Sequence, residues 1–557
     1  MGAKGSDGRA GLTRVTGTAL VLVVAVPFAF VVLQAIFPQL GSGSLAAPFS
    51  QVANTLGDPK LFRLSLNTIG LGVGVALLSA LIALPLAVLR ALFKVPGAAI
   101  WDGLMLVPFM IPPYIATLGW ILSLQPRGYL QQLFGFNLAP FLFSVNGVVF
   151  VMSLSCFPVI YFAVSRTLEA VGARYADVAQ VFGASPLRAF WRITLPLSTP
   201  GLAASLLLVF AMAIEEYGTP AKLGRQAGFD VLVTGIDTRV SDWPVDLAGA
   251  SIMALTLVAL SLGAFLIQRR VVMRRSYQTT TGKPQALVRR PLGSFKIPVL
   301  CWFGLVTLLA SGLPLLAILL TALSRTLSGG LVPDNMGLQN FLSIADNGAG
   351  ALRALGNSLT LGVSTALLAG LIGALAAYAI TRPRRRGALT LDILASLPNA
   401  LPGIVVALGL ILAWNQPALP ISPYNTPLIL LLAYCCILLP QPVRYAHAAF
   451  LQIGANLEDA ARVFGASPLT AFRRILLPLI APSLIASMLL VFAVASRELV
   501  ASLLVAPVGM TTVSTFIWRQ FEQGSVGMGM AMAFLAIIIT TLIPLAILGM
   551  MRKGPLM

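Results

Sequence analysis

Four charged residues in or beside apolar stretches are the side chains best placed to act on a solute in this sequence. They are Glu215 and Glu216 in one half of the chain, and Arg497 and Glu498 in the other. A carboxylate in apolar surroundings is costly unless it is paired or hydrated, and such groups often mark a substrate route. We single out Glu216 and Glu498 as candidate pathway residues. The structural alternative is that Glu498 pairs with a nearby cation and that Glu216 caps a helix end.

Residues for other chemistry are scarce. The sequence has one histidine, His447, and four cysteines without metal-ligand spacing, so we predict no catalytic residue and no metal site. The string closest to a Walker A loop is YQTTTGKP, which lacks the first glycine and has proline where serine or threonine would bind magnesium. We therefore expect this chain itself to bind no cofactor.

The elements that position these residues are membrane spans. Of the 557 residues, 58% are hydrophobic and only 10% are charged, and the mean hydropathy is +0.91. A span needs about 20 apolar residues, and such runs recur along the whole chain. The sequence predicts an all-α integral membrane protein with about 12 transmembrane helices. The predicted spans are residues 16–37, 66–89, 101–123, 144–165, 199–219, 247–268, 297–321, 357–380, 391–413, 426–449, 481–505 and 528–550.

The basic residues predict the orientation of the spans. With both termini in the cytoplasm, the inside segments and inner span halves hold 27 of the 37 lysines and arginines, and the outside segments and outer span halves hold ten. Cytoplasmic loops of membrane proteins carry such an excess. The net charge of +19 is therefore a topology signal, and we expect no nucleic-acid partner. The basic stretch 269–296 is the predicted cytoplasmic linker between two halves.

The two halves are sequence repeats. The stretch from Leu66 resembles the stretch from Gly356, and a set of prolines and glycines recurs at a constant offset. Pro108, Pro112 and Gly119 match Pro398, Pro402 and Gly409, 290 residues later. Residues 1–268 and 297–557 hold six predicted spans each, so the repeat is parallel, and we expect a solute pathway along its pseudo-two-fold axis. The prolines break the third and ninth spans, either as interrupted helices that line the pathway or as simple kinks.

A half-polar stretch also occurs twice. VFGASPLRAFWRITLPL (181–197) and VFGASPLTAFRRILLPL (463–479) agree at 14 of 17 positions. In the first copy Gly183 predicts a helix stop with positive φ, and Ser185-Pro186 predicts an N-cap and a first-turn proline. We expect Leu195-Pro196 to end a second short helix. The second copy repeats each step, so two equivalent helix pairs face the cytoplasm, either as partner surfaces or packed under their own halves.

This stretch resembles the EAA loop of permease subunits in binding-protein-dependent ABC importers. The pattern residues are Asp177, Ala179, Gly183, Ile193, Leu195 and Pro196 in the first copy, and Asp459, Ala460, Ala461, Gly465, Ile475, Leu477 and Pro478 in the second. Aspartate replaces the usual glutamate in both copies, and Val178 replaces alanine in the first. The resemblance implies that loops 168–197 and 450–479 dock on ATPase subunits, and that the fold is like that of a type I ABC importer permease.

Two more stretches resemble one group of these permeases. EEYGTPAKLG (215–224) and SRELVASLLVAPVG (496–509) are similar to the fused permeases of iron(III) importers, a group that includes 2-aminoethylphosphonate and thiamine permeases, with polyamine permeases as relatives. The resemblance implies a bacterial inner-membrane permease with two cytoplasmic ABC ATPase subunits, which use ATP and magnesium. It also implies a periplasmic or extracellular solute-binding protein, with iron(III) as the expected cargo and the other three solutes as alternatives.

A transporter driven by an ion gradient is the rival from another class. Such a protein normally relays ions through charged residues inside the membrane, and the candidates here are few: Glu215, Glu216, Arg497 and Glu498. This alternative gives no reason for the duplicated cytoplasmic stretch.

Overall fold

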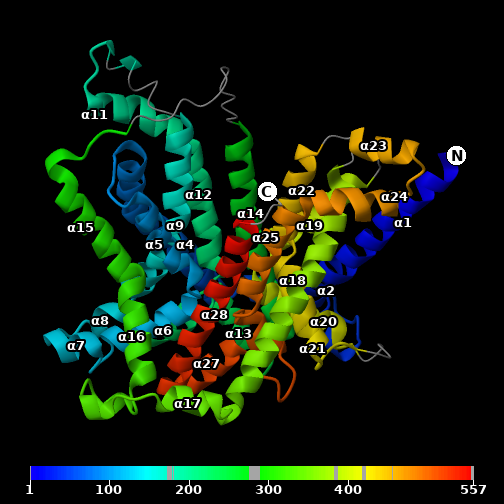
Figure 1. Ribbon diagram of the computed structural model, residues 1–557. Coiled ribbons are helices and arrows are strands. Elements are labelled where there is room, and N and C mark those ends of the chain that lie inside the picture. Colours follow the sequence, from blue (N-terminus) through cyan, green and yellow to red (C-terminus); the bar gives the residue numbers. More distant parts are fainter. Residues whose placement is uncertain are drawn as a thin grey trace. The chain divides into compact units, whose positions relative to one another are not determined.

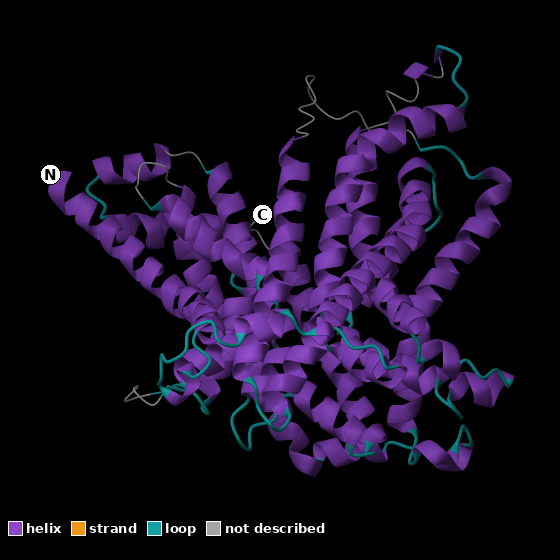
Figure 2. Cartoon of the chain, turned by 180° about the vertical axis from the view of Figure 1, so that it is seen from behind, coloured by secondary structure: helices purple, strands orange, loops and turns teal. Residues whose placement is uncertain are grey.

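The chain is helical wherever it is described. The computed structural model describes residues 2–171, 178–179, 181–274, 289–381, 387–416, 422–453 and 456–553. These residues form helices and loops, with two isolated β-bridges and no strand (Figure 2). Nine described helices are long and apolar enough to cross a membrane, and the number rises to 12 if each of three bent helix pairs is one span. The predicted all-α fold with about 12 spans is confirmed.

The described chain divides into two compact units, and each unit draws on both sequence halves. The first comprises Met1–Asp58, Ile236–Val258 and Gly337–Met557, and the second comprises Pro59–Gly235 and Ala259–Met336. We call them the 337–557 unit and the 59–235 unit after their longest segments. The first predicted span therefore belongs with most of the second half, and the seventh belongs with most of the first half.

In the 59–235 unit, α4, α9 and α12 pack against one another, and α16 packs on α6 (Figure 1). The helices with all their residues in this unit are α4 (Pro59–Leu92), α5 (Ala98–Met110), α6 (Pro113–Leu124), α7 (Tyr129–Phe134), α8 (Ala139–Leu142), α9 (Val145–Val171), α11 (Pro186–Ala189), α12 (Leu195–Glu215), α15 (Lys296–Thr307) and α16 (Leu313–Leu323). Two helices have residues in both units, α13 (Leu232–Ser241) and α14 (Leu247–Arg274).

In the 337–557 unit, α18 packs against α22 and α25, and α2 packs on α20 (Figure 1). Its helices are α1 (Gly2–Leu20), α2 (Val26–Ile36), α3 (Val52–Leu56), α17 (Gln339–Ala345), α18 (Ala351–Thr381), α19 (Ala388–Ser396), α20 (Gly403–Trp414), α21 (Pro427–Leu438), α22 (Pro440–Gln452), α23 (Asn456–Val463), α24 (Pro468–Ala471), α25 (Leu477–Ala495), α26 (Val500–Val505), α27 (Val513–Glu522) and α28 (Val526–Lys553).

Single π-helical turns recur before prolines. One joins α1 to α2 at Val21–Ala25, and another joins α15 to α16 at Leu308–Gly312. Proline is the second residue of the helix that follows in both places. A proline has no N–H and its ring disturbs the regular i→i−4 ladder, and a π turn lets the helix absorb that irregularity. The first and seventh spans thus have the same local construction.

The third and ninth spans are sharply broken at equivalent positions. The segments Ala98–Met110 and Pro113–Phe134 meet at 94°, and Ala388–Ala400 and Gly403–Trp414 meet at 114°. The chain turns at Pro112 and Pro402, whose extended ψ values of 133° and 144° end the helical path. Bends of this size go well beyond a kink, so of the two readings of these prolines the structure supports interrupted helices.

The fifth and eleventh spans end earlier than predicted. Helix α12 stops at Glu215 instead of residue 219, and the predicted span 481–505 is split into α25 and α26 by residues 496–499. Hydropathy did not reveal these two helix ends, because the residues on both sides of each one are apolar. Glu216 and Glu498 lie directly in these breaks.

Candidate docking loops and pathway residues

The two loops that the resemblance suggests for ATPase docking, residues 168–197 and 450–479 and called the docking loops from here on, contain the same helix-ending turn. Gly183 and Gly465 have φ values of +86° and +83°, as their sequence context predicted. The residue after each glycine closes the turn, because Ala184 N–H donates to the Ala179 carbonyl at 2.9 Å and Ala466 N–H donates to Ala461 at 3.0 Å. This six-residue closure around a left-handed glycine is the Schellman motif.

A serine begins the next helix in both loops. The Ser185 Oγ accepts from the Arg188 N–H at 3.3 Å, and the Ser467 Oγ accepts from the Thr470 N–H at 3.2 Å. Each serine satisfies an N–H that the first helical turn leaves open, and the proline that follows needs no donor there. The predicted N-caps are confirmed.

The expectation that Leu195-Pro196 and Leu477-Pro478 end a short helix was wrong. The backbone stays helical from α11 through a π turn at Phe190–Thr194 into α12, and from α24 through Phe472–Leu476 into α25. The proline is again the second residue after a π turn, so the turn accommodates it without a break. The second helix of each loop is thus the beginning of a long helix that continues into the membrane.

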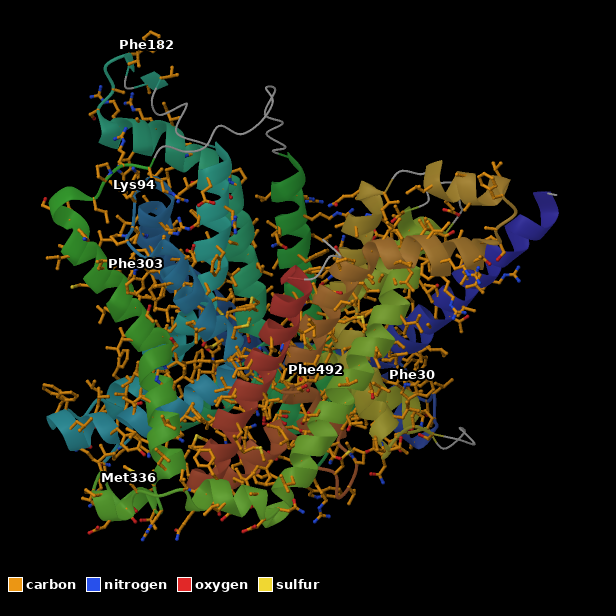
Figure 3. All side chains as sticks on the ribbon, in the orientation of Figure 1. Phe30, Lys94, Phe182, Phe303, Met336 and Phe492 are labelled. Atoms are coloured by element: carbon orange, nitrogen blue, oxygen red, sulfur yellow. The ribbon has the colours of Figure 1, made fainter. Side chains whose placement is uncertain are left out.

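Large apolar side chains project just before both glycines. Val181 and Phe182 are 84% and 85% exposed, and Val463 and Phe464 are 83% and 91% exposed. Figure 3 shows Phe182 at the outer end of the first docking loop. Exposed aromatic and aliphatic neighbours at a tight turn are typical of a contact surface for another protein.

The remaining pattern residues occupy matching places where they are described. Ile193 and Ile475 are half-buried in the two π turns, and the prolines at 196 and 478 are exposed. Ala179 is half-buried and Ala461 is buried, one turn before their glycines. Asp459 and Ala460 lie in α23, whereas Asp177 lies outside the described residues.

The second loop is also tied to the helices beneath it. The Tyr378 hydroxyl donates to Glu458 Oε1 at 2.9 Å, and Glu458 is 1% exposed. Helix α1 packs against α24, beside which it lies in Figure 1.

The candidate pathway residue Glu216 caps the turn that follows α12. Its Oε2 and Oε1 accept from the Thr219 N–H at 2.9 and 3.2 Å. The Thr219 hydroxyl is buried and lies 2.8 Å from the Thr117 hydroxyl of α6. Glu216 therefore fixes the turn after the fifth span, and Thr219 ties that turn to the broken third span.

Glu498 has the same role in the 337–557 unit. Its carboxylate accepts from the N–H groups of Ala501 and Ser502, each at 3.2 Å, at the start of α26. The Ser502 hydroxyl lies 2.5 Å from the Tyr434 hydroxyl of α21. Glu216 and Glu498 are both half-buried residues that act as caps, and backbone N–H donors stabilise the charge of each carboxylate.

Two adjacent polar positions make equivalent hydrogen bonds in both units. They were not singled out from the sequence alone. The Asn67 side chain donates to the Asp230 carbonyl at 2.8 Å, and the Asn357 side chain donates to Thr511 at 2.9 Å. The next residues, Thr68 and Ser358, accept from the first N–H groups of α13 and α27 at 2.9 and 2.8 Å. Their recurrence at offset 290 was the available signal.

The family comparison decides the identity of this architecture. The family described as "Binding-protein-dependent transport system inner membrane component" matches the chain twice, over residues 79–277 and 369–552. The chain belongs to this family of inner-membrane transport components. Each match contains one docking loop and one of the capping glutamates, so the predicted resemblance is confirmed for both halves. The family description names a membrane component of a transport system, and the long apolar helices of this chain agree with a multi-pass inner-membrane protein.

Individual relatives in this transport family are similar over much of the chain. A "Ferric transport system permease protein FbpB" of Actinobacillus pleuropneumoniae is 27% identical over 94% of this chain and 76% of its own length. A "Fe(3+)-transport system permease protein FbpB 2" of Haemophilus influenzae is 24% identical over 89% of this chain and 90% of its own length. A "Putative 2-aminoethylphosphonate transport system permease protein PhnV" of Salmonella typhi is 31% identical over 42% of this chain and 86% of its own length.

Proposed function

We propose that this chain is a membrane permease subunit of an ATP-driven importer, with one docking loop for each of two cytoplasmic ABC ATPase subunits. The duplicated Schellman turn with its exposed Val-Phe pair carries this proposal. One chain presents two such surfaces, which match the needs of a dimeric ATPase. ATP and magnesium are used by the ATPase, and movement of its two subunits shifts the docking loops and the spans joined to them.

The proposed cargo is iron(III), delivered from outside by a solute-binding protein. The ferric permease relatives support it, because they are similar to nearly the whole chain. The 2-aminoethylphosphonate permeases are the second candidate, because their higher identity of 31% covers a shorter region. Thiamine and polyamines remain alternatives from the sequence resemblance.

Glu216 and Glu498 are the proposed charged residues of the translocation route. They hold equivalent positions in the two repeats, at breaks in the fifth and eleventh spans, and each is only half-buried. Their carboxylates are already bound by backbone N–H groups, so we propose that they attract a cationic cargo through their charge without giving up their capping bonds.

Purification of the tagged chain from its native membrane tests the docking proposal. We expect an ABC ATPase to co-purify, and the double variant Phe182→Ser/Phe464→Ser to lose it while the permease level stays normal, because both side chains are exposed. Trp243→Ser is the matched control, since Trp243 is 91% exposed but far from either loop in sequence. ATPase recovery at the wild-type level with the double variant would contradict the proposal.

Reconstitution tests the cargo. Proteoliposomes that contain the permease, the co-purified ATPase and the partner binding protein should take up radioactive iron(III) when ATP is present. Uptake of 2-aminoethylphosphonate without iron uptake would replace the first cargo with the second. Uptake driven by an ion gradient without ATP would instead support a secondary transporter.

A further inference from the structure

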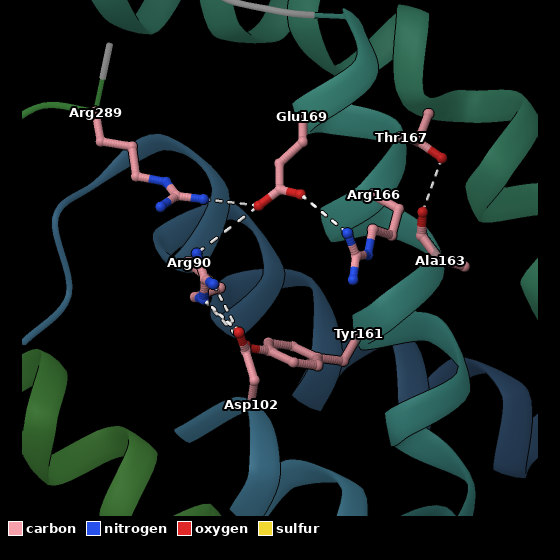
Figure 4. Close-up of polar contacts among 8 residues, drawn as sticks. All are labelled: Arg90, Asp102, Tyr161, Ala163, Arg166, Thr167, Glu169 and Arg289. Atoms are coloured by element: carbon pink, nitrogen blue, oxygen red, sulfur yellow. Dashed lines mark hydrogen bonds and ion pairs between the residues drawn. The ribbon is translucent and has the colours of Figure 1, made fainter. Parts of the chain in front are cut away.

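An ionic cluster joins α4, α5 and the end of α9 within the 59–235 unit (Figure 4). At its centre Arg90, on α4, donates to Asp102, on α5, with Nε–Oδ1 at 3.0 Å and Nη2–Oδ2 at 2.6 Å. The Tyr161 hydroxyl, from α9, donates to Asp102 Oδ1 at 2.7 Å. The Arg90 side chain is only 13% exposed, so water screens this forked pair weakly. Three helices are thereby fixed to one another.

Glu169 extends this cluster into the first docking loop (168–197), of which it is the second residue. It lies in the last turn of α9, which ends at Val171. Its Oε1 accepts from Arg289 Nη2 at 2.8 Å and lies 3.7 Å from Arg90 Nη1. Arg166 also approaches Glu169, but at 3.9 Å and with 82% of its side chain exposed. The hydrogen bond to Arg289 is therefore the shortest contact of Glu169 in this cluster, and it connects the end of α9 to residue 289 of the linker.

Arg289 belongs to the end of the linker between the two sequence halves. Its neighbour Arg290 is bound to the chain after α4, because Arg290 N–H donates to the Leu92 carbonyl at 3.0 Å and Lys94 N–H donates to Arg290 at 2.8 Å. These bonds form an isolated parallel bridge between Phe93 and Arg290. The linker end is thus held by backbone bonds on one side and by Glu169 on the other.

The second docking loop has no such cluster at the matching positions. The residues that correspond to Arg90 and Glu169 at offsets of 290 and 282 are Ile380 and Leu451. The second loop is supported instead by the buried hydrogen bond from Tyr378 to Glu458 and by apolar packing around Tyr378, with Phe450 and Phe472 among the buried side chains. Two loops with nearly the same sequence are therefore anchored by different chemistry.

We propose that Glu169 and Arg289 are positioning residues that couple the first docking loop to the linker and to α4. The proposal rests on the proposed function, since it assumes that the loop docks on an ATPase. Force on the loop reaches α9 first, and the Glu169–Arg289 bond passes it to the linker end, which leads directly into the seventh span. Without that bond the loop can move while the spans lag behind, so ATP hydrolysis continues with less transport.

The test measures uptake per ATP hydrolysed in proteoliposomes, for Glu169→Gln, Arg289→Gln and the double variant. Each single change should lower this ratio by at least about threefold, within the range found for residues in coupling networks. The double variant should be no worse than the worse single variant, because both changes remove one bond. Arg166→Gln is the matched control: it removes a charge near the same carboxylate, but from an exposed and distant partner, so the ratio should stay unchanged.

Each outcome separates this inference from the proposed function. If wild-type permease binds no ATPase, the proposed function itself fails. If it binds ATPase and the ratio is unchanged in Arg289→Gln and Glu169→Gln, the coupling role is wrong and the cluster only stabilises the fold. Additive losses in the double variant, or an equal loss in Arg166→Gln, would also overturn it. Uptake and hydrolysis are both normalised to folded protein, and the ratio is insensitive to yield if a variant folds poorly.

Discussion

Gly119 lies directly against Pro314. A Cβ added to Gly119 would come within 2.6 Å of the Pro314 carbonyl oxygen and 2.9 Å of its Cα. The equivalent Gly409 is equally close to Pro27, with 2.5 Å to the carbonyl oxygen. In both units a broken helix thus crosses a proline that follows a π turn, and glycine at the crossing allows the two backbones to touch.

Replacing either glycine with alanine should destabilise the permease. The new methyl group meets backbone, which cannot rotate away, so we expect a cost of about 1–3 kcal/mol for each change. Thermal unfolding of the detergent-purified protein should begin at a lower temperature in Gly119→Ala and in Gly409→Ala. Gly103→Ala is the control, because a Cβ there has no heavy atom within 4 Å. Equal stability of all three variants would contradict the crossing geometry.

The docking-loop glycines should tolerate asparagine better than valine. Left-handed backbone costs an ordinary residue about 1–2 kcal/mol, and a β-branched side chain fits it worst, whereas asparagine adopts it most readily. Gly183→Val and Gly465→Val should therefore insert normally but lose ATPase binding or uncouple hydrolysis from transport. Gly183→Asn and Gly465→Asn should retain most uptake. If valine and asparagine behave alike, the positive φ values are not what the loops require.

Cysteine labelling should reveal the proposed topology. In a variant without native cysteines, a cysteine placed within residues 276–288 should react with an impermeant reagent only after the inner membrane is opened. A cysteine within residues 328–337 should react in intact spheroplasts, since the lysine and arginine distribution places that segment outside. The reverse pattern of labelling would overturn the orientation with cytoplasmic termini.

Charge and capping at Glu216 and Glu498 can be separated by two substitutions. Glutamine keeps a carbonyl acceptor for the backbone N–H groups but removes the charge, so Glu216→Gln/Glu498→Gln should insert at a normal level and lose most uptake. Alanine removes the cap as well, which costs about 1 kcal/mol for each helix end. Glu216→Ala/Glu498→Ala should therefore also lower the amount of folded protein. Normal uptake at normal protein level in the double glutamine variant would remove both carboxylates from the mechanism.

The sequence alone predicted the docking turns well. The turn at Gly183 and the cap at Ser185-Pro186 depend on bonds between residues at most six positions apart. The local sequence is therefore sufficient to predict them. The breaks at Pro112 and Pro402 are local for the same reason. The end of the second loop helix was mispredicted, because a proline in a helix leads to either a break or a π turn and the local residues do not choose between them.

Three features were decided only by tertiary structure. The first span belongs to the compact unit of the second half, and nothing in its sequence says so, because lipid is as apolar as a helix neighbour and an all-apolar span shows no preferred face. The capping role of Glu498 depended on a helix break hidden in an apolar run. The bond between Glu169 and Arg289 joins residues 120 positions apart. A buried charged residue in the sequence indicates that an oppositely charged partner is needed. Only the fold determines which residue is that partner.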